Sequence, residues 1–158
     1  MRVFVFLSVF LLLTSAAQAS QCYRPKEAEA EQGIRIHSEL MVIGLNCQHM
    51  ATAGDKNLYD AYREFTGHYE SLFATYEDIL LEHFQENGAA DPEAEINKLR
   101  TNFANKISND AATMRPDLFC ARYAPRISKA AKMDYRDVRK WAATIYPSHP
   151  VSKPLCSS

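Results

Sequence analysis

Histidines are the side chains in this sequence best suited to metal binding or proton transfer. There are five of them, namely His37, His49, His68, His83 and His149. A di-iron helical bundle needs a glutamate three residues before a histidine on facing helices, and neither that spacing nor H-E-x-x-H occurs. Glu64 and His68 lie one helical turn apart, which allows only a weak surface metal site. We expect exposed or half-buried histidines with ion-pairing neighbours, except His83, which falls on the apolar repeat after Ile79.

Nucleophilic and cofactor chemistry have no recognisable motif in the chain. There is no G-x-S-x-G, no S-x-x-K and no glycine-rich loop that would hold a phosphate. Tyr62, Tyr69 and Tyr76 recur every seven residues and could line a pocket for an apolar or aromatic ligand. Core packing with the hydroxyl groups at the rim explains the same repeat and is the expectation here. We therefore predict a non-enzymatic protein with no catalytic residue, no cofactor and no metal site.

The four cysteines predict two structural disulfide bonds. Their number is even and none lies in a C-x-x-C motif, and they are Cys22, Cys47, Cys120 and Cys156. Structural disulfides form in oxidising compartments, and the signal-peptide pattern of residues 1–19, described next, predicts export to such a compartment. From sequence alone, three pairings of four cysteines are open.

Residues 1–19 have the pattern of a signal peptide. Arg2 precedes an apolar run over residues 3–13, and Ala17 and Ala19 form the small-residue pattern that signal peptidase cleaves. The run is shorter than the ~20 residues that span a bilayer. We predict cleavage near Ala19, a periplasmic or secreted mature protein over residues 20–158, and no transmembrane segment in it.

The mature chain reads as one all-α domain. Apolar residues repeat at helical spacing over residues 26–48 and 56–86, then from 91 to about 115, over 117–132 and from 134 onward. These segments predict an antiparallel bundle of four or five helices, followed by an extended C-terminal strap over residues 147–154. A continuous helix over 56–86 would be about 46 Å long, against about 34 Å for the first, so it should overhang or bend, with Gly67 best able to permit a bend. Pro125 should kink or break its helix.

This layout favours one pairing of the cysteines. An up-down-up path brings Cys47 and Cys120 to the same end of the bundle, and a final descending helix and the strap could bring Cys156 to Cys22. If the last two helices form a hairpin, the second bond depends on how far the strap reaches.

Basic residues gather late in the chain, although the formal net charge is only −1. They are Arg122, Arg126, Lys129, Lys132, Arg136, Arg139 and Lys140. A net charge near zero argues against nucleic-acid binding. The cluster is either a solvated face or a docking patch, centred on Arg136, Arg139 and Lys140, for an acidic partner or an anionic lipid surface. We expect a protein that binds a protein or envelope surface; the alternative is small apolar-ligand binding or stress-chaperone activity.

Two stretches of the sequence resemble small exported helical proteins of alphaproteobacteria, a group without an assigned activity. These are I-H-S-E-L-M-V-I-G-L-N-C at residues 36–47 and L-F-C-A at 118–121. The resemblance implies a bacterial periplasmic setting and pairing of Cys47 with Cys120. It implies no catalytic residue.

Overall fold

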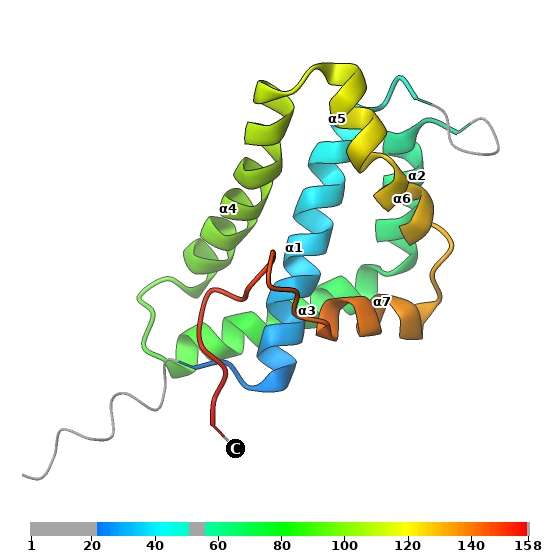
Figure 1. Ribbon diagram of the computed structural model, residues 1–158. Coiled ribbons are helices and arrows are strands. Elements are labelled where there is room, and N and C mark those ends of the chain that lie inside the picture. The colour runs from blue at the N-terminus through cyan, green and yellow to red at the C-terminus, as the bar shows by residue number, and fades with distance from the viewer. Residues whose placement is uncertain (1–21, 51–55, 158) are drawn as a thin grey trace, which may run out of the picture.

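The computed structural model describes residues 22–50 and 56–157, which form a helical bundle without strands (Figure 1). The seven helices within these ranges are α1 (Pro25–Asn46), α2 (Leu58–His68), α3 (Glu70–Glu86), α4 (Pro92–Thr113), α5 (Pro116–Tyr123), α6 (Pro125–Ala130) and α7 (Tyr135–Ala143). The predicted all-α, disulfide-stapled fold with an extended strap is confirmed. Two of the five predicted helices are each divided in two, which accounts for the larger number.

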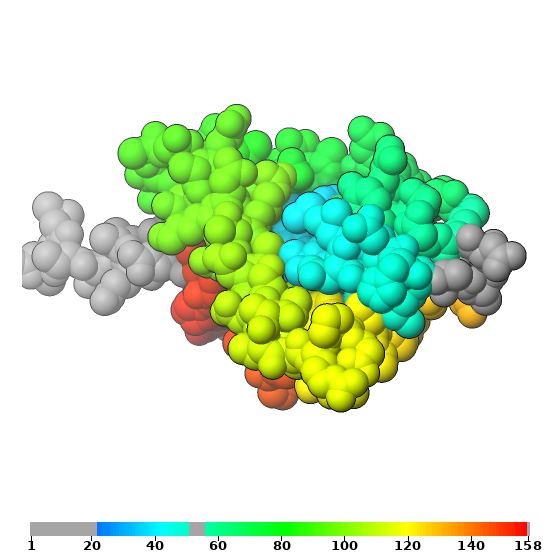
Figure 2. All heavy atoms as spheres, turned by 90° about the horizontal axis from the view of Figure 1, so that it is seen from above, coloured from blue at the N-terminus to red at the C-terminus, as the bar shows by residue number. Residues whose placement is uncertain are grey.

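Helix α1 is the centre of the bundle. It packs against α2, α3, α4 and α7, and the end of α1 seen from above lies between α4, α2 and α5 (Figure 2). Its apolar residues Ile34, Ile36 and Ile43 are fully buried. A helix surrounded on all sides has no free solvent face, so its polar residues are buried as well.

The predicted helix over residues 56–86 is divided at Tyr69 into α2 and α3. Tyr69 has φ −108° and ψ 22°, outside helical values, and α3 turns to cross α1 while α2 runs beside it (Figure 1). The predicted bend is therefore present, but it lies two residues beyond Gly67, which is helical. The turn lets the apolar faces of both helices reach α1, which one straight rod could not do.

The predicted starts of helical segments at residues 91 and 134 are confirmed, and an aspartate caps the helix at each. Asp91 caps α4 by accepting a hydrogen bond from the Ala94 amide at 2.9 Å, and Asp134 caps α7 in the same way through Asp137 at 2.8 Å. Pro125 begins α6, because a proline cannot continue α5.

Both predicted disulfide bonds are present. Cys47 and Cys120, each almost fully buried, join the end of α1 to α5, and Cys22 and Cys156 join the residues before α1 to the strap. The strap does bring Cys156 to Cys22, although α7 packs back against α1. The predicted signal peptide over residues 1–19 and the loop over 51–55 lie outside the described residues. None of the described helices has the length and apolar character needed to cross a membrane.

Candidate functional site

One face of α1 buries charged and polar side chains at helical spacing. Each is at most 4% exposed, and they are Glu27, Glu31, Gln32, Arg35, Ser38 and Glu39. Glutamates in the first turn of a helix are usually solvated, where the macrodipole favours negative charge. Burial of such groups is costly unless each has partners, so their partners identify what covers this face.

The C-terminal strap, residues 146–157, covers this face of α1. Glu31 accepts hydrogen bonds from the amide of Ser152, at 2.7 Å, and from its hydroxyl. Gln32 donates to the carbonyl of His149 at 3.1 Å. Next to the disulfide, the Tyr23 amide donates to the Pro154 carbonyl at 2.8 Å. Two residues of the buried polar face of α1, Glu31 and Gln32, thus bind the strap directly.

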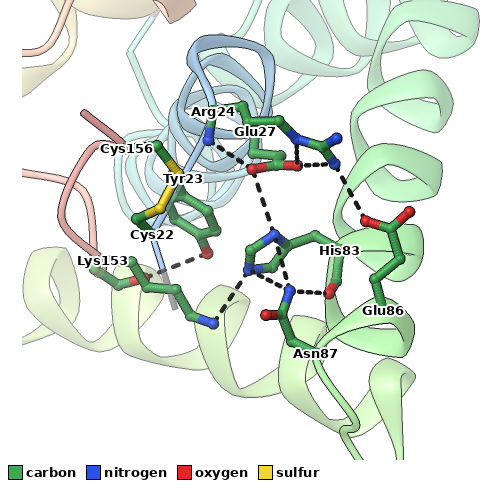
Figure 3. A network of polar contacts seen from close by, with 10 residues as sticks. Cys22, Tyr23, Arg24, Glu27, His83, Glu86, Asn87, Lys153 and Cys156 are labelled. Carbon is green, nitrogen blue, oxygen red and sulfur yellow. Dashed lines mark hydrogen bonds and ion pairs between the residues drawn. A yellow bond between two sulfur atoms is a disulfide. The ribbon is translucent and has the colours of Figure 1, made fainter. Parts of the chain in front are cut away.

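A buried network fastens the strap beside the Cys22–Cys156 bond (Figure 3). Glu27 accepts from the amide and Nε of Arg24, both at 2.6 Å, and lies 3.4 Å from His83 Nδ1. Lys153 Nζ lies 3.1 Å from His83 Nε2. An ammonium group can only donate, so Nε2 accepts and the imidazole proton is on Nδ1, facing Glu27.

The pKa values in this network keep Glu27 charged and His83 neutral. Burial, followed by the nearby ammonium of Lys153, lowers the pKa of His83. Burial alone would raise the pKa of Glu27, but the hydrogen bonds from Arg24 outweigh it and lower that pKa. His83 is only 2% exposed, so the network acts as a structural latch.

Two arginines share one buried carboxylate further along α1. Glu39 Oε2 accepts from Nη1 of Arg35 at 3.1 Å and from Nη1 of Arg126, on α6, at 3.0 Å. The other oxygen, Glu39 Oε1, has no hydrogen-bond partner among the described residues; His149 Nε2 lies 3.8 Å from it. Burial, followed by the charge of Arg35, lowers the pKa of His149.

These arginines line a hollow of about 670 Å³, which we call the basic hollow. Three lysines line it as well, which are Lys129, Lys132 and Lys140. None of the three has a carboxylate partner among the described residues. Asp137 is the one carboxylate among the described residues that line the hollow, and Trp141 and Tyr146 contribute aromatic surface.

The three residues of the predicted docking patch, which lie together on α7 (Tyr135–Ala143), have different partners. Lys140 lines the basic hollow, but Arg139 forms two hydrogen bonds with Glu29, at 2.9 and 3.1 Å. Arg136 lies outside the hollow, 91% exposed and 3.6 Å from Asp134. Lys129, Lys132 and Arg126 were part of the basic run in the sequence, whereas no sequence signal marked Arg35, nearly a hundred residues earlier.

The other candidates from the sequence have structural roles. The repeating tyrosines lie in the core and satisfy their hydroxyl groups, as expected: Tyr69 donates to the Met133 carbonyl at 2.5 Å and Tyr76 to Glu29 at 2.9 Å. Of the histidines, only His83 is fully buried, which confirms the exception drawn from the apolar repeat.

Ser148, His149 and Glu39 have the order of a serine–histidine–acid triad but not its chemistry. Ser148 Oγ lies 2.8 Å from His149 Nδ1, and the carboxylate lies beyond hydrogen-bond distance of the ring. In a working triad the acid hydrogen-bonds the imidazole and stabilises its charged form. Here two guanidinium groups take up the charge of Glu39 and the pKa of His149 is lowered, so the imidazole is a weak base.

Comparisons with protein-family models, curated proteins and solved structures found no match to this chain. The resemblance to alphaproteobacterial exported proteins stays a prediction. The geometry of the strap and the basic hollow is therefore the basis for the function proposed next.

Proposed function

We propose that the mature protein is a non-enzymatic binding protein of the periplasm or the extracellular space, and that it attaches to an anionic envelope surface through the basic hollow. The observation that carries this proposal is the set of lysines without carboxylate partners around the hollow. Like charges held close together repel one another, and a concave wall focuses their field toward whatever enters. An anion relieves that repulsion.

The aromatic residues of the hollow favour a membrane-like surface over an acidic protein. Tyr146 is 46% exposed and Trp141 half-buried, and both line the hollow together with lysines. Tryptophan, tyrosine and lysine combine an apolar body with a polar end, which suits the boundary between headgroups and acyl chains. Each lysine near an anionic membrane contributes about 1 kcal/mol.

The proposed setting draws on two independent features of the chain. Two disulfide bonds suit an oxidising compartment, and the pattern of residues 1–19 suits export. Neither depends on the basic hollow, so the location and the ligand are separate proposals.

The alternative of small apolar-ligand binding or stress-chaperone activity would use a different hollow. One of about 490 Å³ is lined by Met50, Leu58, Ala124 and Pro125, but Lys129 also borders it. An apolar ligand there would do nothing to balance the lysines. We therefore place the function at the basic hollow.

Vesicle sedimentation tests the proposal. The mature protein should sediment with vesicles containing phosphatidylglycerol and stay in solution with neutral phosphatidylcholine vesicles. A triple variant of the lining lysines to glutamine (Lys129, Lys132 and Lys140) should lose about a hundredfold in affinity, at about 1 kcal/mol per lysine. A matched triple with the same change in charge on exposed positions outside the basic hollow (Lys26→Gln, Arg63→Gln and Lys98→Gln) should bind nearly as well as the wild type.

Two results would contradict the proposal. Equal losses in the two triple variants would mean that net charge, not the hollow, governs attachment. Binding to an acidic protein without binding to anionic vesicles would assign the hollow to a protein partner instead.

A further inference from the structure

The floor of the basic hollow holds two guanidinium groups in fixed positions. Arg35, 4% exposed, donates from Nε to Gln32 at 2.6 Å and from Nη1 to Glu39. The guanidinium of Arg126 lies 4.8 Å above the ring of Tyr123 and shares the same Glu39 oxygen. Both groups are therefore oriented before any ligand arrives, which reduces the entropic cost of binding.

Donor groups remain unused on both arginines. Arg35 Nη2, and Nε and Nη2 of Arg126, have no hydrogen-bond partner among the described residues. The planar fork of a guanidinium matches two oxygens of a carboxylate or phosphate. Two forks from different helices, joined by one carboxylate, offer donors to several oxygens of a single anion.

The charge around the floor indicates which anion fits. Five cationic side chains line the basic hollow, and two carboxylates, Asp137 in its lining and Glu39 beneath it, oppose them, which leaves a surplus of three positive charges. A single carboxylate group would leave most of that surplus unbalanced. A phosphate monoester, with close to two negative charges at neutral pH and three terminal oxygens, balances it better.

The geometry points to a phosphate seat between Arg35 and Arg126 at the floor of the basic hollow. This inference rests on the proposed function, since it names the group of the anionic partner that enters the hollow. The volume of about 670 Å³ is that of a small-molecule site rather than of a bare ion. The rest of the phosphorylated molecule therefore lies against Trp141 and Tyr146.

A phosphate group can come from a lipid headgroup or from a soluble phosphorylated molecule. Calorimetric titration with glycerol 3-phosphate tests the soluble form, and vesicles that contain phosphatidic acid or, at equal surface charge, phosphatidylserine test the lipid form. We expect glycerol 3-phosphate to bind, acetate to bind at least tenfold more weakly, and phosphatidic acid to be preferred over phosphatidylserine.

Arg126→Gln and Arg136→Gln form a matched pair of variants. Both remove one positive charge from the same end of the chain, but Arg136 lies outside the basic hollow. Loss of charge-assisted hydrogen bonds should make Arg126→Gln bind glycerol 3-phosphate about tenfold to a hundredfold more weakly, with Arg136→Gln within about twofold of the wild type. Arg126→Lys keeps the charge but not the fork, and it should lose about tenfold. Glu39 keeps its bond to Arg35 in all three, and a thermal melt checks that each is folded.

The outcomes separate this inference from the proposed function. If the protein binds anionic vesicles but does not prefer glycerol 3-phosphate over acetate or phosphatidic acid over phosphatidylserine, the phosphate seat is wrong and the envelope proposal stands. If glycerol 3-phosphate binds and no vesicle does, the seat stands and its ligand is a soluble phosphorylated molecule. Equal effects of Arg126→Gln and Arg136→Gln, or no binding of any probe, would overturn the seat.

Discussion

Removing the Cys22–Cys156 disulfide should lower the free energy of unfolding by about 4 kcal/mol. The two cysteines are 134 residues apart, but the Cys47–Cys120 bond already bypasses 73 of those residues. The path that remains has about 60 residues, and closing a loop of that length in the unfolded chain is worth about 4 kcal/mol on the chain-entropy account. Without the bypass the same account gives about 5 kcal/mol.

Urea unfolding of Cys22→Ser with Cys156→Ser measures this loss. Both positions are half-buried, so the substitution opens little space in the core. With an m-value of about 2 kcal/mol per molar urea, the midpoint should fall by roughly 2 M. The other pair gives the contrast: Cys47 and Cys120 are almost fully buried, so Cys47→Ala with Cys120→Ala should lose packing in addition to its loop term and cost more.

Two outcomes would refute this reasoning. A loss in unfolding free energy below about 1 kcal/mol would mean that the C-terminal segment is already restricted in the unfolded chain without the bond, or that the bond strains the folded protein. A rise in hydrogen exchange at the Ser152 amide, which donates to Glu31, that exceeds the rise at core amides of α1 exchanging by global unfolding would mean that the bond holds the native strap in place. The cost would then arise in the folded state and not in the unfolded ensemble.

Three further predictions test the buried face and the packing of α1. Burial lowers the pKa of three histidines, which are His37, His83 and His149. As the pH is lowered through about 6.5, these histidines therefore take up protons in the unfolded chain before they do so in the folded protein, and the urea midpoint should fall. An unchanged midpoint between pH 7.5 and 5.5 would contradict this. Gly33→Ala would place a Cβ 2.2 Å from Tyr76 Cδ2, so it should cost about 1–3 kcal/mol by the same assay, whereas Gly67→Ala meets nothing within 4 Å and should stabilise by up to about 1 kcal/mol. Glu31→Gln weakens two hydrogen bonds that the strap donates to a fully buried carboxylate and should cost about 1–3 kcal/mol; a loss as small as that of the exposed Glu86→Gln would show that the carboxylate charge is unimportant.

Signals that are local in the sequence predicted the fold well. Asp91 and Asp134 cap helices because an aspartate before a helical repeat satisfies free amides of the first turn. The disulfide pairs followed from the order of the helices, since the ends that meet are set by connectivity. The bend in the helix predicted over residues 56–86 was expected from its excess length, but its position at Tyr69 depends on how two faces dock on α1.

The candidate site could be predicted only in part, because the basic run in the sequence contains its lysines but its other parts come from distant segments. Arg35 lies on α1, Arg126 on α6, and His149 in the strap. Charged residues at four-residue spacing usually mark a solvated helix face. The sequence holds no local signal that this face of α1 is buried, because the cover is a strap more than a hundred residues later.

The strap couples the latch to the basic hollow. His149 lines the hollow, and only three residues later Ser152 binds Glu31, followed by Lys153 at His83 and Cys156 at the disulfide. The buried carboxylate of Glu31 is tolerable only while the strap supplies its partner, Ser152, since an unpaired buried carboxylate costs several kcal/mol. The latch therefore stabilises one wall of the hollow as well as the fold. A short extended segment without an apolar core of its own can be held this firmly because α1 has polar residues, in place of apolar ones, on the face that binds it.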